Sequence, residues 1–132
     1  GNAKKMAAFL AGGPHAVVGA SRDRDKYGNK VLRCYLQHGR RVFPVNPQAA
    51  QIEGLAAYGD LGTLPEPVHG ISVITPPRIS EWVIEQAAAL GIERVWMQPG
   101  AESIAAIARA EAAGMSVIAD GSCILVELGY AD

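Results

Sequence analysis

The sequence has no surplus of either charge. Its 132 residues include 12 Lys and Arg against 13 Asp and Glu. Proteins that bind DNA or RNA usually carry a basic surplus, so this balance argues against a nucleic-acid partner. A small ligand with a few phosphates needs only a local cluster of positive charge, and the composition allows one.

Cysteine is scarce, and long apolar runs are missing. The two cysteines, Cys34 and Cys123, do not have the spacing of a metal-binding pair, so we expect free thiols in a reducing compartment. No apolar run approaches the ~20 residues of a membrane span, and the N-terminus lacks the apolar core of a signal peptide. These absences favour a cytoplasmic protein without a membrane partner.

What is present is a repeated pattern of helix and strand. Apolar residues at helical spacing are followed by a glycine and then by a short apolar run. This pattern predicts helices over 29–38, 79–90 and 104–112 and strands over 41–45, 94–97 and 116–119. Strands over 16–18 and 71–74 and a leading helix over 4–10 complete the set. Residues 48–68 are interpreted as irregular, with a short strand at 55–58 and a helical turn near 61–64.

Strands that alternate with helices of this length predict right-handed βαβ crossovers and a parallel sheet. We therefore expect an α/β fold: a doubly wound, mainly parallel, five-stranded Rossmann-like sheet in a single domain over 1–132. Residues 1–14 would form a leading helical segment and 124–132 a tail. The apolar run Ile124–Leu128 could dock on its own domain or on another chain, which leaves a homo-oligomer open.

The predicted carboxyl ends of the strands differ from the amino ends, which carry mostly charged residues. In open parallel sheets, ligands bind at the carboxyl edge, where the strand order reverses. Loops are generally rich in proline and glycine, but here three ends place proline directly after an amide or hydroxyl residue. We expect a ligand crevice along these ends: Gly19, Ala20 and Ser21; Asn46 and Pro47; Thr75, Pro76 and Pro77; Gln98, Pro99 and Gly100; and Asp120, Gly121 and Ser122.

The first of these loops has the character of a phosphate site. Gly19 permits close approach of the backbone to a ligand, Ser21 offers a hydroxyl, and the helix near Gly28 would present unpaired N–H groups. Positive charge would come from some of Arg22, Arg24 and Lys26. The alternative is a solvated loop in which Asp23 and Asp25 balance these cations.

The sequence of this loop and of the second strand matches the pattern of a standard dinucleotide-binding site poorly. Eight residues separate Gly19 from Gly28, which does not fit the G-x-G-x-x-G pattern. The end of the second strand carries Asn46, where nicotinamide cofactor sites usually have a carboxylate. Both departures count against NAD binding without excluding it.

In order along the chain, the segments "AVVGAS", "YGNKVLRCYLQHGRRVFPVNP", "IEGLAAYGDLGTLPE", "ISVITPP", "ALGIERVWMQPGAE" and "AAGMSVIADGSC" resemble the small stand-alone coenzyme A-binding proteins. These are similar to the Rossmann-like N-terminal domain of the succinyl-CoA synthetase α subunit. The resemblance implies coenzyme A (CoA) or an acyl-CoA as ligand. It covers nearly all of residues 16–123.

The resemblance also implies a role for each strand end. Ser21 and the residues 22–24 would contact the phosphates, and Asn46 and Pro47 the adenosine. Thr75, Pro76 and Pro77 would flank the nucleotide and the start of the pantetheine, which would then pass Met97, Gln98 and Pro99. Relatives often have a lysine where this chain has Gln48. That departure leaves open a regulatory or scaffold domain with a vestigial site.

Catalysis is not expected from the sequence. It has no paired carboxylates for acid–base chemistry and no metal-ligand cluster, and none of its three histidines falls at the proposed crevice. Trp82 and Trp96 could stack on an adenine, but core packing is expected for both. Cys123 is expected to be an inert, semi-buried thiol, although a mixed disulfide with the coenzyme's own thiol is an alternative. The hypothesis is therefore binding of CoA or an acyl-CoA without chemistry, with an NAD(P)-binding module as the first alternative.

Overall fold

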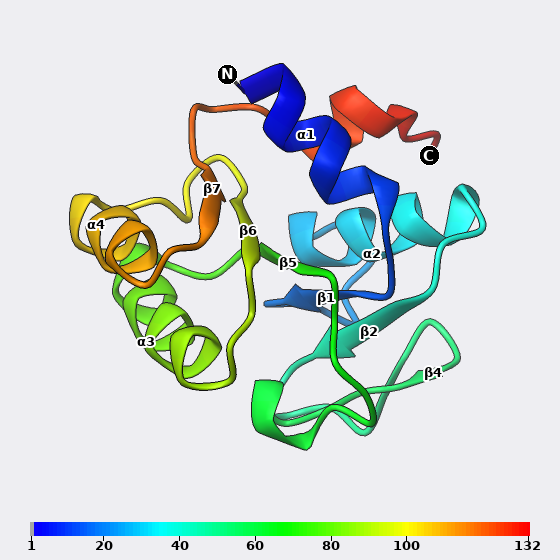
Figure 1. The fold of residues 1–132 in the computed structure, drawn as a ribbon. Coiled ribbons are helices and arrows are strands. Elements are labelled where there is room, and N and C mark those ends of the chain that lie inside the picture. Colours follow the sequence, from blue (N-terminus) through cyan, green and yellow to red (C-terminus); the bar gives the residue numbers. More distant parts are fainter. Residues whose placement is uncertain (1) are drawn as a thin grey trace.

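The computed structural model describes residues 2–132 and contains a five-stranded parallel sheet between two layers of helices (Figure 1). The strand order is β2-β1-β5-β6-β7, and every neighbouring pair is parallel. The predicted α/β, doubly wound parallel sheet is therefore confirmed. The strands are β1 (His15–Val18), β2 (Val42–Val45), β5 (Gly70–Val73), β6 (Arg94–Met97) and β7 (Ser116–Ile118). Gly1, with which the predicted leading segment begins, lies outside the described residues.

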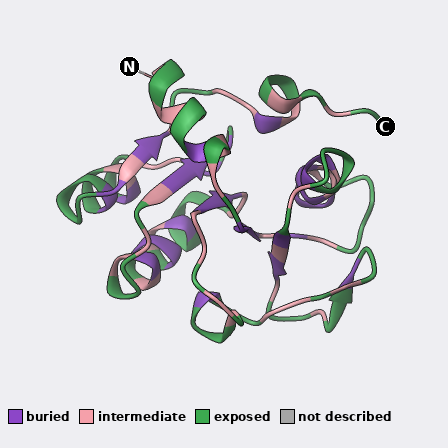
Figure 2. Cartoon of the chain, turned by 45° about the vertical axis from the view of Figure 1, so that its right-hand side comes forward, coloured by how far each residue is buried: buried purple, intermediate pink, exposed green. Residues whose placement is uncertain are grey.

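The two faces of the sheet are covered by different helices. Helices α1 (Asn2–Ala11) and α2 (Tyr27–Gln37) pack on one face, and α3 (Pro77–Ala89) and α4 (Ile104–Ala112) on the other. Val17 points into the first core, whereas Ala16 and Val18 point into the second. The central strands are almost entirely buried (Figure 2), and most of their residues are apolar because helices cover both faces of the sheet.

The order of the strands reverses between β1 and β5. From β1 the chain runs through α2 to β2 at the sheet's edge, and it then returns to β5 on the other side of β1. From there α3 and α4 lead it outward to β6 and β7. The helices that follow β1 and β5 pack on opposite faces of the sheet. The carboxyl ends of β1, β2 and β5 therefore lie next to a gap between the two helical layers.

The segment between β2 and β5 is more regular than predicted. It holds an antiparallel hairpin of β3 (Gln51–Ile52) and β4 (Leu55–Ala56), followed by the 3-10 helix η1 (Leu61–Thr63). The irregular reading and the strand over 55–58 were thus partly wrong, while the helical turn is confirmed. Both residues of the hairpin turn have positive φ, 51° at Glu53 and 78° at Gly54, and glutamate is not a residue that usually signals such a turn.

The C-terminal tail docks on its own domain. Ile124 is fully buried, and the π-helical turn η2 (Leu125–Gly129) packs against α2. His38 Nε2 lies 2.7 Å from the carbonyl oxygen of Gly129, and the Gln37 side chain pairs with the backbone of Ala131. The sequence left open whether the apolar run Ile124–Leu128 docks on its own domain or on another chain. In the structure Ile124, Leu125 and Leu128 all pack against the core on the α1/α2 face of the same domain.

His15 is a buried structural residue at the start of β1. Its Nε2 lies 2.7 Å from the carbonyl oxygen of Phe9, so this nitrogen carries the hydrogen and donates it to the end of α1. Burial lowers the pKa of His15 from 6.5 to about 4, against the opposing effect of that hydrogen bond. The imidazole is therefore neutral in the folded protein at neutral pH.

This histidine should make stability depend on pH. The unfolded chain binds a proton near pH 6.5 and the folded chain only near pH 4, so the free energy of unfolding falls as pH decreases through that window. The expected loss is about 3 kcal/mol between the two limits. Urea unfolding of the wild type and of His15→Gln at several pH values checks this. Equal pH slopes in the two proteins would contradict the assignment.

Candidate functional site

A large pocket opens at the carboxyl edge of the sheet, at the reversal point between β1 and β5. Its volume is about 1160 Å³. One wall is the loop after β1 with the start of α2, and the opposite wall is η1 with the exposed side of α3. The residues that follow β2 and β5 lie between them. The wall residues of these elements include Ser21, Lys26, Tyr27, Gly28, Asn46, Pro47, Asp60, Leu61, Thr75, Pro76, Ile79, Trp82 and Gln86.

The start of α2 is seated directly on the end of β1. A Cβ atom on Gly28 would lie only 2.0 Å from the carbonyl oxygen of Gly19, so glycine is required at position 28. Gly19 itself has φ +97°, and a Cβ there would lie 2.6 Å from the carbonyl oxygen of Ile74. The two glycines that do not fit the dinucleotide spacing therefore allow a close packing of α2, β1 and β5.

Hydrogen bonds within the chain hold the loop between these glycines in one shape. The Asp23 N–H donates to Ser21 Oγ over 3.0 Å, and the Asp25 N–H donates to Asp23 Oδ1 over 3.0 Å. Buried Asn29 donates from Nδ2 to the carbonyl oxygen of Ser21 over 2.8 Å. The loop is thus fixed by its own turns before any ligand arrives.

The N-terminus of α2 is uncapped and faces the pocket. Its N-cap residue, Lys26, provides no side-chain cap. Among residues 2–132, the backbone N–H groups of Ser21, Tyr27 and Gly28 have no hydrogen-bond acceptor. Unpaired N–H groups, the positive end of the helix dipole and the Lys26 ammonium together make this wall suited to an anion such as a diphosphate.

Asn46 ties the second strand to this first loop. Its Nδ2 donates to the carbonyl oxygen of Ala20 over 2.8 Å, and its Oδ1 accepts from the Gln48 N–H over 2.7 Å. Both ends of the side chain are thus engaged within the protein. Asn46 lines the pocket, but its position is explained by these two bonds alone.

The opposite wall is apolar and carries an exposed tryptophan. Trp82 is 78% exposed and lies on the pocket with Ile79, which is 47% exposed. The prediction that Trp82 packs in the core was therefore wrong, because α3 turns Val83 and Ile84 to the sheet and leaves position 82 outside. For Trp96, which is fully buried in β6, the same prediction is confirmed.

The structure brings together most of the predicted binding residues and leaves the others outside the pocket. Those that line it are Gly19, Ala20, Ser21, Lys26, Asn46, Pro47, Thr75 and Pro76. Those that do not are Arg22, Arg24, Pro77, Met97, Gln98 and Pro99. Arg24 pairs with Glu53 at 3.5 Å, and the side chains of Met97 and Gln98 are fully buried.

Beside the pocket, Tyr27 joins Gln98 and Cys123 in a small polar cluster. The Tyr27 hydroxyl lies 3.0 Å from Gln98 Oε1 and 2.7 Å from Cys123 Sγ. Burial, with the contact to Cys123, raises the pKa of Tyr27 well above its usual value, so the phenol is neutral. Cys34 and Cys123 are both free thiols, and burial raises the pKa of Cys34 to about 11.

Sequence reasoning missed several residues of the far wall. Asp60 caps η1 by accepting the Gly62 N–H, and Gln86 Oε1 accepts the Leu61 N–H over 3.2 Å. The only signal in the sequence was the short helical turn predicted near residues 61–64. The position of that turn opposite α3 follows from the chain's return across the sheet, which no local pattern encodes.

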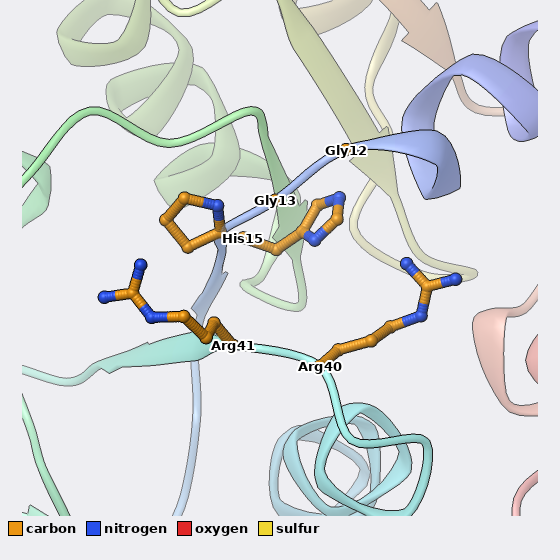
Figure 3. A pocket seen from close by; sticks show the side chains of 6 residues that line it. Gly12, Gly13, His15, Arg40 and Arg41 are labelled. Carbon is orange, nitrogen blue, oxygen red and sulfur yellow. The ribbon is translucent and has the colours of Figure 1, made fainter.

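A smaller hollow of about 270 Å³ lies at the opposite, amino edge of the sheet (Figure 3). It is lined by Gly12, Gly13, Pro14, His15, Arg40 and Arg41. The two arginine side chains extend in opposite directions in Figure 3. Arg40 donates to the carbonyl oxygen of Leu10, and Arg41 pairs with Glu66. Because both guanidinium groups already have partners, this hollow is a poor anion site.

Two further features of the described residues bear on the kind of site. Within 2–132, no group of three or more His, Cys, Asp and Glu side chains is arranged to hold a metal ion. In the same range, none of the helices has the length and apolar character needed to span a membrane.

Solved structures share this fold over nearly the whole chain. A conserved hypothetical protein from Pyrococcus furiosus is 41% identical, with a TM-score of 0.81 over 86% of this chain and 97% of that one. A protein from Thermus thermophilus is 30% identical, with a TM-score of 0.86 over 96% of each chain. The dinucleotide-forming acetyl-coenzyme A synthetase 1 of Ca. Korarchaeum cryptofilum is 26% identical, with a TM-score of 0.75 over 87% of this chain but 28% of that one.

Curated relatives are much longer proteins. The α subunit of acetate–CoA ligase (ADP-forming) II from Pyrococcus furiosus is 27% identical over 81 residues, which cover 61% of this chain and 18% of the ligase subunit. Acetate–CoA ligase (ADP-forming) II from Archaeoglobus fulgidus is 32% identical over 80 residues, 59% of this chain and 12% of the ligase. The chain thus spans less than a fifth of these relatives.

The family comparison covers the domain described above. The model of the CoA binding domain matches residues 15–129, from the first residue of β1 to the last residue of η2. This match confirms the resemblance to CoA-binding proteins that the sequence motifs indicated. The chain belongs to the CoA-binding domain family.

Proposed function

We propose that the pocket at the reversal point binds CoA or an acyl-CoA and that residues 2–132 hold this ligand without chemistry of their own. The observation that carries the proposal is the uncapped N-terminus of α2, which directs unpaired N–H groups and Lys26 into a pocket large enough for a nucleotide. Family membership and the acetate–CoA ligase relatives support CoA as the nucleotide.

The diphosphate of the ligand would lie against Ser21, Tyr27 and Gly28. The N–H groups of these residues are free, and the loop that presents them is already fixed by internal turns. A preformed anion site pays little conformational entropy on binding. Of the three cations that the sequence offered, Lys26 lies on the pocket, whereas Arg24 pairs with Glu53 and Arg22 lies elsewhere on the loop.

The rest of the ligand would follow the strand ends. The adenosine would lie along Pro47 and Pro76, which line the pocket after β2 and β5. The pantetheine would leave toward residues 97–99. Because Met97 and Gln98 are fully buried, the surface that the arm meets there is that of the exposed Pro99 and Gly100.

An NAD(P)-binding module is the second candidate function, and the geometry makes it weaker. The residue after β2 is Asn46, whose amide and carbonyl are both engaged within the chain. The carboxylates that do line the pocket, Asp60 and Glu85, come from the start of η1 and from α3 rather than from the end of β2. A vestigial site in a regulatory domain is the third candidate, for which Gln48 in place of a basic residue is the supporting feature.

Thermal unfolding separates these candidates. A ligand that binds only the folded state at about 100 times its Kd should raise the Tm by about 10 °C. We expect CoA to raise the Tm more than NADH or NADPH at equal concentration. A larger shift with either nicotinamide cofactor would favour the second candidate, and no shift with any of the three would favour the third.

Single substitutions test which cation serves the site. We expect Lys26→Ala to weaken CoA binding about tenfold, because it removes a charge-assisted contact to phosphate. Arg22→Ala should change the Kd little. Lys30→Ala, one turn further along α2 and outside the pocket, is the matched control. Titration calorimetry gives the three Kd values, and a larger loss from Arg22→Ala than from Lys26→Ala would contradict the placement of the diphosphate.

A further inference from the structure

We propose that Glu53, at the tip of the β3–β4 hairpin, is a positioning residue that holds the loop over residues 21–26 in the shape that receives the ligand. This inference rests on the proposed function, because that loop is the wall assigned to the diphosphate. Glu53 is not among the residues that line the pocket, so it would act on the ligand only through Asn29.

Glu53 has an unfavourable backbone conformation. Among residues 2–132 it is the one residue other than glycine with a positive φ, 51°. A side chain with a Cβ is disfavoured in this left-handed region, whereas glycine adopts it readily. Such outliers persist where the surrounding contacts impose them, and they are frequent at functional sites. The turn alone would favour glycine at position 53, so the reason for a glutamate lies in its side chain.

The side chain of Glu53 extends to the start of α2. Its Oε2 accepts from Asn29 Nδ2 over 3.1 Å and lies 3.5 Å from Arg24 Nε. The Arg24 side chain is 64% exposed, so water screens the ion pair and weakens it. Asn29 is fully buried, and a buried amide hydrogen without an acceptor is costly. The hydrogen bond to Asn29 is therefore the more important of the two contacts.

Asn29 connects this contact to the loop. One hydrogen of Nδ2 goes to Glu53, and the other goes to the carbonyl oxygen of Ser21 over 2.8 Å. Its Oδ1 accepts from Arg33 Nε over 2.6 Å. Both amide hydrogens and the oxygen are thus engaged, which fixes the plane of the amide. The amide in turn fixes the orientation of Ser21, whose free N–H is assigned to the diphosphate.

The hairpin that carries Glu53 is itself anchored. Ile52, the preceding residue, is 1% exposed and belongs to the same core cluster as Val31 and Leu32 of α2. The Tyr58 N–H, just after β4, donates to the carbonyl oxygen of Pro44 in β2 over 3.0 Å. The tip could not move away from α2 without exposing Ile52 to water. Glu53 is therefore a fixed support for the loop.

Glu53 has two effects on an anionic ligand, and they have opposite signs. Its carboxylate repels phosphate and engages Arg24, so its removal should strengthen binding through charge alone. Loss of the contact to Asn29 should weaken binding, because the loop is then less preorganised. Glu53→Gln removes the charge but keeps an oxygen acceptor at the same length, whereas Glu53→Ala removes both. Since both variants release Arg24, their difference isolates the positioning contact.

Titration calorimetry with CoA measures this difference. We expect Glu53→Ala to bind CoA about fivefold more weakly than Glu53→Gln, which is the effect of one hydrogen bond. Glu53→Gly should share the weakened Kd of Glu53→Ala. Its Tm should nevertheless be higher than that of Glu53→Ala, because glycine relieves the strain at φ 51°. A merely structural role would instead make affinity follow stability.

Equal Kd values for the Gln, Ala and Gly variants overturn this inference and leave the proposed function intact. Binding of CoA by Glu53→Gly as tight as that by Glu53→Gln also overturns it, because backbone strain and not the contact to Asn29 would then control affinity. Failure of the wild type to bind CoA overturns the proposed function, and the inference with it.

Discussion

The contact between Gly28 and the carbonyl oxygen of Gly19 is the constraint on which the site depends. It sets the start of α2 directly against the end of β1, closer than any other residue at position 28 would allow. Since the helix begins there, its unpaired N–H groups face the space between the ends of β1, β2 and β5. Asn29 and Asn46 then fix the intervening loop from both sides. The anion site that we propose for the pocket would thus be formed mainly by the backbone, with charge added by Lys26.

The two walls of the pocket differ in chemistry, and this difference would orient a bipolar ligand. One wall offers unpaired N–H groups and an ammonium group; the other offers an exposed indole, an amide and carboxylates. A nucleotide has anionic phosphates at one end and a flat base at the other, so it would fit between these two walls in only one orientation. Prolines between the walls have fixed φ and keep the strand ends stiff.

Local sequence patterns predicted the sheet and its helices because those patterns have local causes. Apolar stripes at helical spacing, closed by glycines such as Gly91 and Gly114, mark where each helix ends and the next strand begins. The hairpin of β3 and β4 was missed because Glu53 adopts a positive φ that glutamate seldom takes. The motifs also supported membership of the CoA-binding family, which the comparison with known domains confirmed.

The far wall was beyond sequence reasoning for a different reason. Position 82 directly precedes the buried residues Val83 and Ile84 of α3. Whether Trp82 faces the core or the pocket therefore depends on how α3 is rotated against the sheet, which the sequence does not specify. Likewise, spacing along one loop could not tell which of Arg22, Arg24 and Lys26 lines the pocket, because turns at Ser21 and Asp23 determine their directions. Tertiary geometry decides both questions.

The most direct test of the central claim is an NMR titration of the backbone amides with CoA. If the diphosphate binds at the start of α2, the resonances of Ser21, Tyr27 and Gly28 should shift most strongly and saturate together. If these amides stay unchanged while others move, for instance those around Gly13 and Arg40 at the opposite edge, the uncapped helix is not the phosphate site.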